Sequence, residues 1–281
     1  MTDISSSHAA AQEILAKIPF WRGRPDFAII HDGRTNSNFT AVDDRGKYFA
    51  RFGIDLPHHF IFREHETRAA RLAAELGVAP PLLYAAEGVM VCEFIEGRGL
   101  VIADGQSRAL LFRIAGILRR LHQGRADSIG QVFDLDRILP AYVDRLPEGA
   151  LPPDDLSRVC RVIDRLPKLS ADCLIHSDLI PNNFLDDGRR LWLIDWEYAG
   201  LGHPSVDLAM VIANFDLPED LARPLVEEHG LCSYEEVAAM TPALVVRELL
   251  WTLVQIGLVG LAGDLPEYRE ICFRRLRELP A

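Results

Sequence analysis

Short apolar runs separated by turn residues dominate the first hundred residues, and a helical period dominates most of the rest. The runs predict five strands, because each is short and bounded by Gly, Asp, Asn or Pro, at residues 27–30, 38–42, 48–52, 82–85 and 89–94. Helical spacing predicts a short helix over 8–19 and a second over 60–76, which Gly77 ends. The N-terminal part is therefore expected to be a sheet with one inserted helix.

The pattern changes near residue 97, where the segment 96–99 is polar and rich in glycine. Downstream, helical spacing predicts helices at 104–123, 134–147, 153–167 and from 204 onward, including a long apolar segment over 243–261. Two short apolar runs, 173–175 and 191–194, interrupt the helices. We predict an α+β chain with an N-terminal antiparallel sheet lobe, residues 1–97, and a larger, mainly helical C-terminal lobe, residues 98–281.

Composition and charge limit the kinds of molecule that the protein is expected to bind. The formal net charge of -11 argues against a nucleic-acid surface, which needs clustered Lys and Arg, and mildly favours a cationic substrate. Five scattered cysteines without a C-x-x-C pair predict reduced core residues. No N-terminal signal pattern is found, and no stretch approaches the ~20 uncharged apolar residues of a membrane span. We expect a cytoplasmic protein without membrane insertion, and the sequence predicts no oligomeric state.

The two short apolar runs carry the residues with recognisable chemistry. Asp178 follows the first run, Asn183 comes five residues later, and Asp195 ends the second run. Phosphoryl transfer requires a carboxylate that deprotonates the attacking hydroxyl and metal ions that neutralise the phosphates. Asp178 is the predicted catalytic base, and Asn183 and Asp195 are the predicted ligands of Mg²⁺, which prefers hard oxygen donors. The alternative is a loop whose Asp and Asn residues only turn the chain.

Over most of its length the chain resembles the choline kinase branch of the aminoglycoside phosphotransferase superfamily. The motifs that carry the resemblance are Thr35-Asn36-Ser37-Asn38-Phe39, Arg51, His176 to Asn183 and Ile194 to Ala209. The resemblance implies a protein-kinase-like two-lobe fold, ATP and Mg²⁺ as cofactors, and a hydroxyl of choline or a related amino alcohol as acceptor. Two positions depart from the family pattern: Ser177 replaces Asn or Gly, and His203 replaces Asp.

The resemblance also implies a nucleotide side. Arg51 is expected to reach the α- and β-phosphates and to pair with Glu66, with Glu64 as the alternative partner. Isolated surface charges are the other reading of these residues. The first turn, residues 31–38, is expected to cover the phosphates, and Met90 to Ile95 is expected to form the hinge whose backbone binds adenine. The nucleotide-binding residues predicted from the turn and this hinge are Thr35, Asn36, Asn38, Glu93 and Ile95.

Aromatic residues indicate the acceptor side. Tyr198 and Trp251 resemble residues of a cage that binds a quaternary ammonium group by cation–π attraction. Trp251 lies in an apolar helical segment, so a core position is the alternative. Glu197 is predicted either to bind the substrate cation or to carry a structural charge.

Three further residues are predicted to support the loop rather than touch substrate: His176 through hydrogen bonds, Trp196 through packing and Asp207 through hydrogen bonds to the loop. The predicted function is an ATP-dependent kinase of choline or a related amino alcohol. Two alternatives stay open. One is a kinase for another acceptor, such as an aminoglycoside or thiamine, and the other is a pseudokinase without activity.

Overall fold

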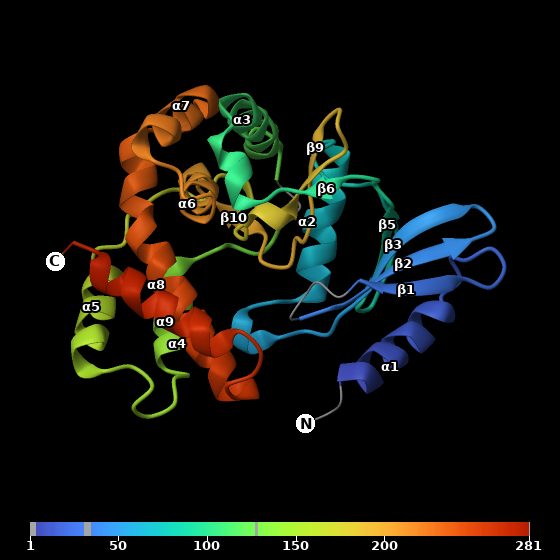
Figure 1. The fold of residues 1–281 in the computed structure, drawn as a ribbon, viewed down its shortest axis with the longest axis horizontal. Coiled ribbons are helices and arrows are strands. Elements are labelled where there is room, and N and C mark those ends of the chain that lie inside the picture. The colour runs from blue at the N-terminus through green and yellow to red at the C-terminus, as the bar shows by residue number, and fades with distance from the viewer. Residues whose placement is uncertain (1–3, 31–34, 127–128, 281) are drawn as a thin grey trace.

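A five-stranded antiparallel sheet forms one end of the molecule and a group of helices forms the other (Figure 1). The computed structural model describes residues 4–30, 35–126 and 129–280. The strand order is β1-β2-β3-β5-β4. The strands are β1 (Asp26–Ile30), β2 (Ser37–Asp43), β3 (Gly46–Phe52), β4 (Leu82–Ala86) and β5 (Val89–Glu93). All five lie within three residues of the predicted positions.

The sheet has a small core of its own beneath helix α1 (Ile4–Ala16). Side chains alternate between the two faces of a strand, so Phe39 and Ala41 of β2 are buried on the same side. They pack in one cluster with Ala11 and Leu15 of α1 and with Ala50 of β3. This cluster does not include the inserted helix.

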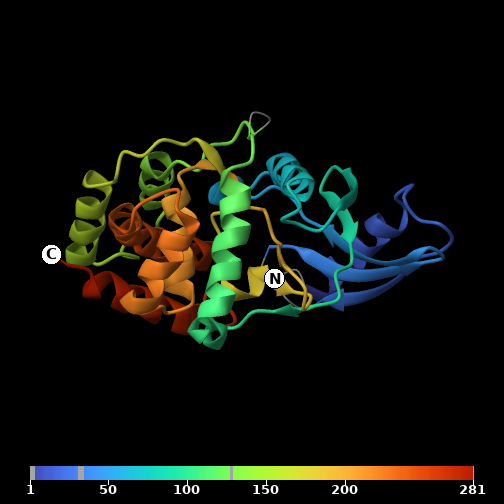
Figure 2. The same cartoon turned by 90° about the horizontal axis from the view of Figure 1, so that it is seen from above.

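The inserted helix α2 (Arg63–Glu75) lies between the sheet and the C-terminal helices (Figures 1 and 2). Two of its buried side chains, Arg63 and Glu66, are charged, and the other three are small alanines, Ala69, Ala70 and Ala73. The three alanines belong to the large core of the C-terminal lobe. The helix ends at Gly77, whose φ of 68° suits glycine. Sequence position therefore assigns α2 to one lobe, whereas packing joins it to the other.

The C-terminal lobe is mainly helical, as predicted. The region expected as one helix over 104–123 contains a short 3₁₀ turn, η2 (Ile102–Gln106), and helix α3, which Ser107 caps. The helices are α3 (Arg108–His122), α4 (Leu135–Val143), α5 (Pro153–Asp164), α6 (Pro204–Asn214), α7 (Glu219–His229), α8 (Tyr234–Val259) and α9 (Leu265–Glu278).

Helix α8 is the central helix of this lobe and contacts α4, α5, α6, α7 and α9. By length and composition it is the one helix of the described residues that could cross a membrane. Two charges in its middle, Arg247 and Glu248, interrupt its apolar run. In the structure 56% of its apolar window is buried by the neighbouring helices.

Short strands position the loops between the lobes. β7 (Cys173–Ile175) pairs with β10 (Gly200–Gly202), and β8 (Phe184–Asp186) pairs with β6 (Arg98–Gly99) and β9 (Leu191–Leu193). The sequence did not predict β6, β8 and β10. The chain leaves the first sheet after Glu93 and joins the second at Arg98, and the domain boundary at residue 97 stays a prediction.

Candidate active site

The loop after β7 is held by a fully buried carboxylate. Asp207, near the start of α6, accepts hydrogen bonds of 2.9 Å from the backbone N–H groups of His176 and Ser177. Ser177 has a φ of 63°, a conformation that is sparsely populated outside glycine. The two bonds fix this turn, so the predicted supporting role of Asp207 is confirmed.

Two histidines, His122 and His229, form a hydrogen-bonded chain that ends at Asp207. The N–H of Leu231 donates to Nδ1 of His229, so Nε2 of His229 carries the proton and donates to Nδ1 of His122 at 2.8 Å. Nε2 of His122 in turn donates to Asp207 at 3.0 Å. Burial, with the nearby charges of His122 and Arg119, lowers the pKa of His229 to about 3. The carboxylate therefore has a chain of hydrogen bonds behind it.

His176 joins the loop to the next strand. Its Nε2 donates to the carbonyl of Ile194 at 2.9 Å, and its ring packs on Trp196 with centroids 4.6 Å apart. Burial lowers the pKa of His176, so the ring is neutral near pH 7. The predicted structural roles of both residues are confirmed, and their contacts bring Asp178 and Asp195 to the same region.

Asp178 and Asn183 are in direct contact. The Nδ2 group of Asn183 donates to the backbone carbonyl of Asp178 at 2.7 Å and to its carboxylate at 3.3 Å. Burial raises the pKa of Asp178 to about 7; Arg247 opposes the rise, and Asp195 and Glu197 add to it. A carboxylate with a pKa near the working pH is well suited to general-base catalysis.

Asn183 and Asp195 fit the chemistry of a magnesium site. The backbone carbonyl of Asn183 accepts from the N–H of Ile194 at 3.0 Å, which places the two candidate ligands side by side. Because Nδ2 of Asn183 bonds to Asp178, its Oδ1 is the atom left for a metal ion. Asp195 has a φ of 69°, and its Oδ1 accepts from Arg51 at 2.7 Å. The donor set is an amide oxygen and a carboxylate, which suits Mg²⁺.

Arg51 of β3 forms ion pairs with two acids, Glu66 of α2 and Asp195. Glu66 is buried, whereas Glu64 is exposed and pairs with Arg68, so the structure decides between the two predicted partners. Asn38 lies opposite Arg51 in the strand pair β2–β3. Contact with phosphates remains a prediction for these residues.

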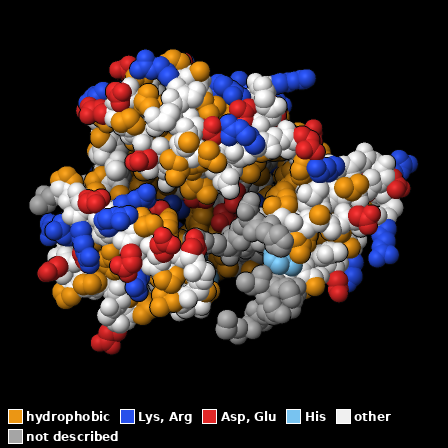
Figure 3. Space-filling view, in the orientation of Figure 1, with side chains coloured by type: hydrophobic (Ala, Val, Ile, Leu, Met, Phe, Trp, Pro, Cys, Tyr) orange, Lys and Arg blue, Asp and Glu red, His pale blue; other side chains and the backbone are white. Residues whose placement is uncertain are grey.

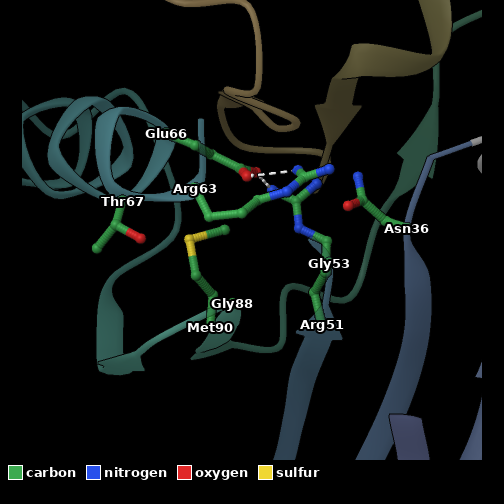
Figure 4. A pocket seen from close by; sticks show the side chains of 8 residues that line it. All are labelled: Asn36, Arg51, Gly53, Arg63, Glu66, Thr67, Gly88 and Met90. Carbon is green, nitrogen blue, oxygen red and sulfur yellow. Dashed lines mark hydrogen bonds and ion pairs between the residues drawn. The ribbon is translucent and has the colours of Figure 1, made fainter. Parts of the chain in front are cut away.

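A second buried arginine, Arg63, was missed by the sequence reasoning. It donates to Glu66 at 2.7 Å, to Glu197 at 3.2 Å and to the carbonyl of Ile54 at 2.8 Å. Figure 4 shows the guanidinium groups of Arg51 and Arg63 directed toward Glu66 around a cavity of about 10 Å³, which has room for about one water. The signal that could have found Arg63 is its position three residues before Glu66, one helical turn away.

Glu197 faces the N-terminal lobe. Its carboxylate accepts from Thr35 Oγ1 at 2.9 and 3.0 Å, from Asn36 Nδ2 at 3.0 Å and from Arg63. These contacts favour the structural alternative for Glu197 over the predicted role in substrate binding. Thr35 and Asn36 are therefore held against the C-terminal lobe, and residues 31–34 of the predicted phosphate turn lie outside the described residues.

The predicted adenine hinge lies at the end of β5. The N–H of Glu93 donates to the carbonyl of Pro81 at 2.9 Å, and Glu93 pairs with Tyr48 in the neighbouring strand. Ile95 is half-buried in the segment that leads to β6. Binding of adenine by Glu93 and Ile95 stays a prediction.

The two predicted acceptor residues meet across the C-terminal lobe. Nε1 of Trp251 donates to the hydroxyl of Tyr198 at 2.8 Å. The Trp251 ring also lies on His59, with centroids 5.1 Å apart and planes inclined by 31°. Figure 3 shows the surface hollowed between the lobes, with acidic and apolar side chains visible in the hollow. Trp251 is half-buried in α8, so it combines core packing with contact to Tyr198.

Arg247, one helical turn before Trp251, was also missed as a site residue. Its guanidinium carbon lies 4.8 Å from the centroid of the Tyr198 ring and 5.2 Å from that of Phe133. The spacing of four residues to Trp251 was the available signal, because residues four apart share a helix face.

His203 takes a local structural position. It is the N-cap of α6, and its Nδ1 accepts from the N–H of Ser205 at 3.3 Å. Burial lowers the pKa of its ring. An aspartate at an N-cap accepts the same bond, so this departure from the family pattern keeps the cap.

Comparison with known proteins gives consistent matches. A model of the phosphotransferase enzyme family matches residues 26–240. Protein LicA of Haemophilus influenzae is 27% identical over 205 residues, which cover 70% of this chain and 60% of that protein, so the chain spans less than two thirds of that relative. A homoserine kinase of Sinorhizobium fredii is 28% identical over 237 residues, covering 75% of this chain and 70% of that enzyme.

A solved structure agrees over the whole fold. A choline/ethanolamine kinase family protein from Mesorhizobium loti superimposes with a TM-score of 0.78 and 25% identity, covering 99% of this chain and 95% of that chain. The predicted protein-kinase-like two-lobe architecture is therefore confirmed.

Proposed function

The chain belongs to the phosphotransferase enzyme family, and from that premise we propose that it transfers the γ-phosphoryl group of ATP to a hydroxyl of a small amino alcohol. One observation carries the proposal: Asp178 and Asn183 hydrogen-bond to each other directly beside Asp195, which Arg51 links to the sheet. A base, two metal ligands and a cation for phosphate oxygens are the parts that phosphoryl transfer requires.

Each residue has one role in this proposal. Asp178 orients the acceptor hydroxyl and takes its proton as the oxygen attacks the γ-phosphorus, and ADP leaves. Asn183 and Asp195 would hold Mg²⁺, which neutralises charge on the phosphates when bound. Arg51 binds phosphate oxygens, and Glu66 keeps its guanidinium in place.

The acceptor class follows from the relatives and the aromatic pair. The relatives' names mention choline, ethanolamine and homoserine, which are short compounds with a hydroxyl and an amino or ammonium group. Tyr198 follows Asp195 by three residues, and Trp251 donates a hydrogen bond to its hydroxyl. The acceptor side is aromatic rather than densely acidic, which argues against a polycationic aminoglycoside.

An acceptor panel tests the proposal. Formation of ADP is measured with Mg²⁺ and choline, ethanolamine, homoserine, thiamine or kanamycin. We expect ADP formation that depends on at least one amino alcohol and stops when EDTA removes the metal. Turnover with kanamycin or thiamine alone would support the alternative acceptors. If none of the five compounds leads to ADP formation, the pseudokinase alternative is favoured.

A further inference from the structure

Arg247 has no role in the phosphoryl-transfer steps proposed above, yet it lies within the acceptor side. It projects from α8 over the ring of Tyr198, and Trp251, which bonds to Tyr198, follows one turn later. Phe133, a buried residue just before α4, provides the second ring. The guanidinium therefore rests on the same aromatic ring that the sequence resemblance assigns to an ammonium cage.

The charge of Arg247 is not matched by a bonded partner within the described residues. Arg51 forms ion pairs with Glu66 and Asp195, and Arg63 forms ion pairs with Glu66 and Glu197. For Arg247, in contrast, no carboxylate of the described chain lies within ion-pair distance; it contacts the two rings, and its charge also acts on Asp178, where it opposes the rise in pKa that burial causes. A half-buried guanidinium has five N–H donors arranged to bind a carboxylate through two parallel bonds.

This position conflicts with simple ammonium binding. A quaternary ammonium group that used the face of Tyr198 would have to displace the guanidinium or lie beside a like charge. Trp251 is also partly covered, because the centroid of the His59 ring lies 5.1 Å from the centroid of its ring. The two rings do not form an open cage for a cation.

We propose that Arg247 binds a carboxylate of the acceptor, so that the substrate is a small hydroxy amino acid, which carries a hydroxyl, an ammonium group and a carboxylate. The inference rests on the proposed kinase function and specifies its substrate class. Arg247 fixes the acid end of the molecule against Tyr198 and Phe133 and leaves the hydroxyl end toward Asp178. Choline and ethanolamine, which lack the acid group, are then poor acceptors.

The experiment compares acceptors that differ only in this charge. Homoserine and homoserine amide are assayed with choline and ethanolamine at saturating ATP, and kcat/KM for the acceptor is measured. We expect homoserine to exceed its amide by roughly tenfold or more, the size expected for a charge-assisted hydrogen bond. In Arg247→Gln this ratio should fall to about one, and Arg247→Lys should retain part of it, because the charge remains without the planar donor pair.

Controls separate the carboxylate site from general damage. Arg247→Met keeps the apolar contact with the rings without a charge, and Arg274→Gln removes an exposed arginine of α9. KM for ATP should stay unchanged in all of these variants. Binding of homoserine to the nucleotide-free protein, followed by tryptophan fluorescence, should weaken roughly tenfold in both uncharged Arg247 variants and not in Arg274→Gln.

Two results would overturn the inference. Equal kcat/KM for homoserine and its amide, or a ratio that persists in both uncharged Arg247 variants, would reject the carboxylate site and leave the kinase assignment intact. Absence of ADP formation with every amino alcohol and amino acid would reject the proposed function, and unchanged homoserine binding in the variants would then reject the Arg247 site as well.

Discussion

The two sides of the site treat charge in opposite ways. On the nucleotide side, Arg51 and Arg63 are paired with Glu66, Asp195 and Glu197 in one buried network that spans both lobes. On the acceptor side, aromatic rings surround a single guanidinium without a bonded acid among the described residues.

We infer that the nucleotide side serves the reaction and that the acceptor side determines which substrate binds. The nucleotide network holds its groups in place before a ligand arrives, and such preorganised charges reduce reorganisation during the reaction. The acceptor side leaves one charge for the ligand to satisfy. A paired network tolerates loss of a member poorly, whereas an unpaired group mainly changes which molecule binds.

The largest effect is expected from Asp178→Asn, because Asp178 lies between the two sides. Loss of the base should lower kcat about 10³-fold, within the range known for general bases, with ATP affinity unchanged. Turnover by a coupled assay and ATP binding by calorimetry check this. Asp164→Asn, an exposed aspartate at the end of α5, is the control. Full magnesium-dependent turnover in Asp178→Asn would reject the mechanism.

The network on the nucleotide side is tested by Arg63→Met. This change leaves Glu197 and Glu66 buried with fewer partners, so the free energy of unfolding should fall by about 3 kcal/mol. Urea denaturation measures it. Arg68→Met, on the same helix, breaks an exposed pair with Glu64 and should cost less than about 1 kcal/mol. Equal losses in the two variants would mean that the buried network does not stabilise the contact between lobes.

The aromatic side is tested by Trp251→Leu. Removing the ring and its hydrogen bond to Tyr198 should lower kcat/KM for the acceptor about tenfold, and KM for ATP should not change. Tyr198→Phe, which removes only the hydroxyl, should have a smaller effect of the same kind. An increase in KM for ATP in either variant would show that the two sides are not separate.

The support beneath the site is tested at low pH. The pKa of His229 is lowered to about 3 in the folded protein, and an unfolded histidine titrates near its ordinary value of 6.5. The unfolded chain therefore binds more protons between these values, so stability falls as pH falls below about 6.5. In His229→Gln the slope of unfolding free energy against pH, between pH 6 and 4, should be shallower by about 1.4 kcal/mol per unit. An unchanged slope would contradict this origin.

Much of the fold could be predicted because the N-terminal strands are long enough to show turn boundaries and the helices long enough to show a period. Strands β6, β8 and β10 could not, since two or three residues show no alternation and tertiary pairing alone defines them.

The site was predictable where spacing along the chain carries chemistry. Asp178, Asn183 and Asp195 lie on one loop and the strand after it, so local spacing brings them together. The sequence could not decide whether Glu64 or Glu66 pairs with Arg51, because both lie in the same helical turn. Only the structure shows that Glu66 is buried and Glu64 exposed. Arg63 and Arg247 are single arginines on helices, and only long-range contacts distinguish them from surface residues.

The packing of α2 has a consequence for how the chain folds during synthesis. Its alanine face is covered by residues of the C-terminal lobe, which leave the ribosome much later. The first sheet and α1 can collapse early on their own cluster, whereas α2 must wait with Ala69, Ala70 and Ala73 exposed. We therefore expect nascent chains that end shortly after residue 97 to be a natural target for chaperones, because they present an apolar helix face without its partner.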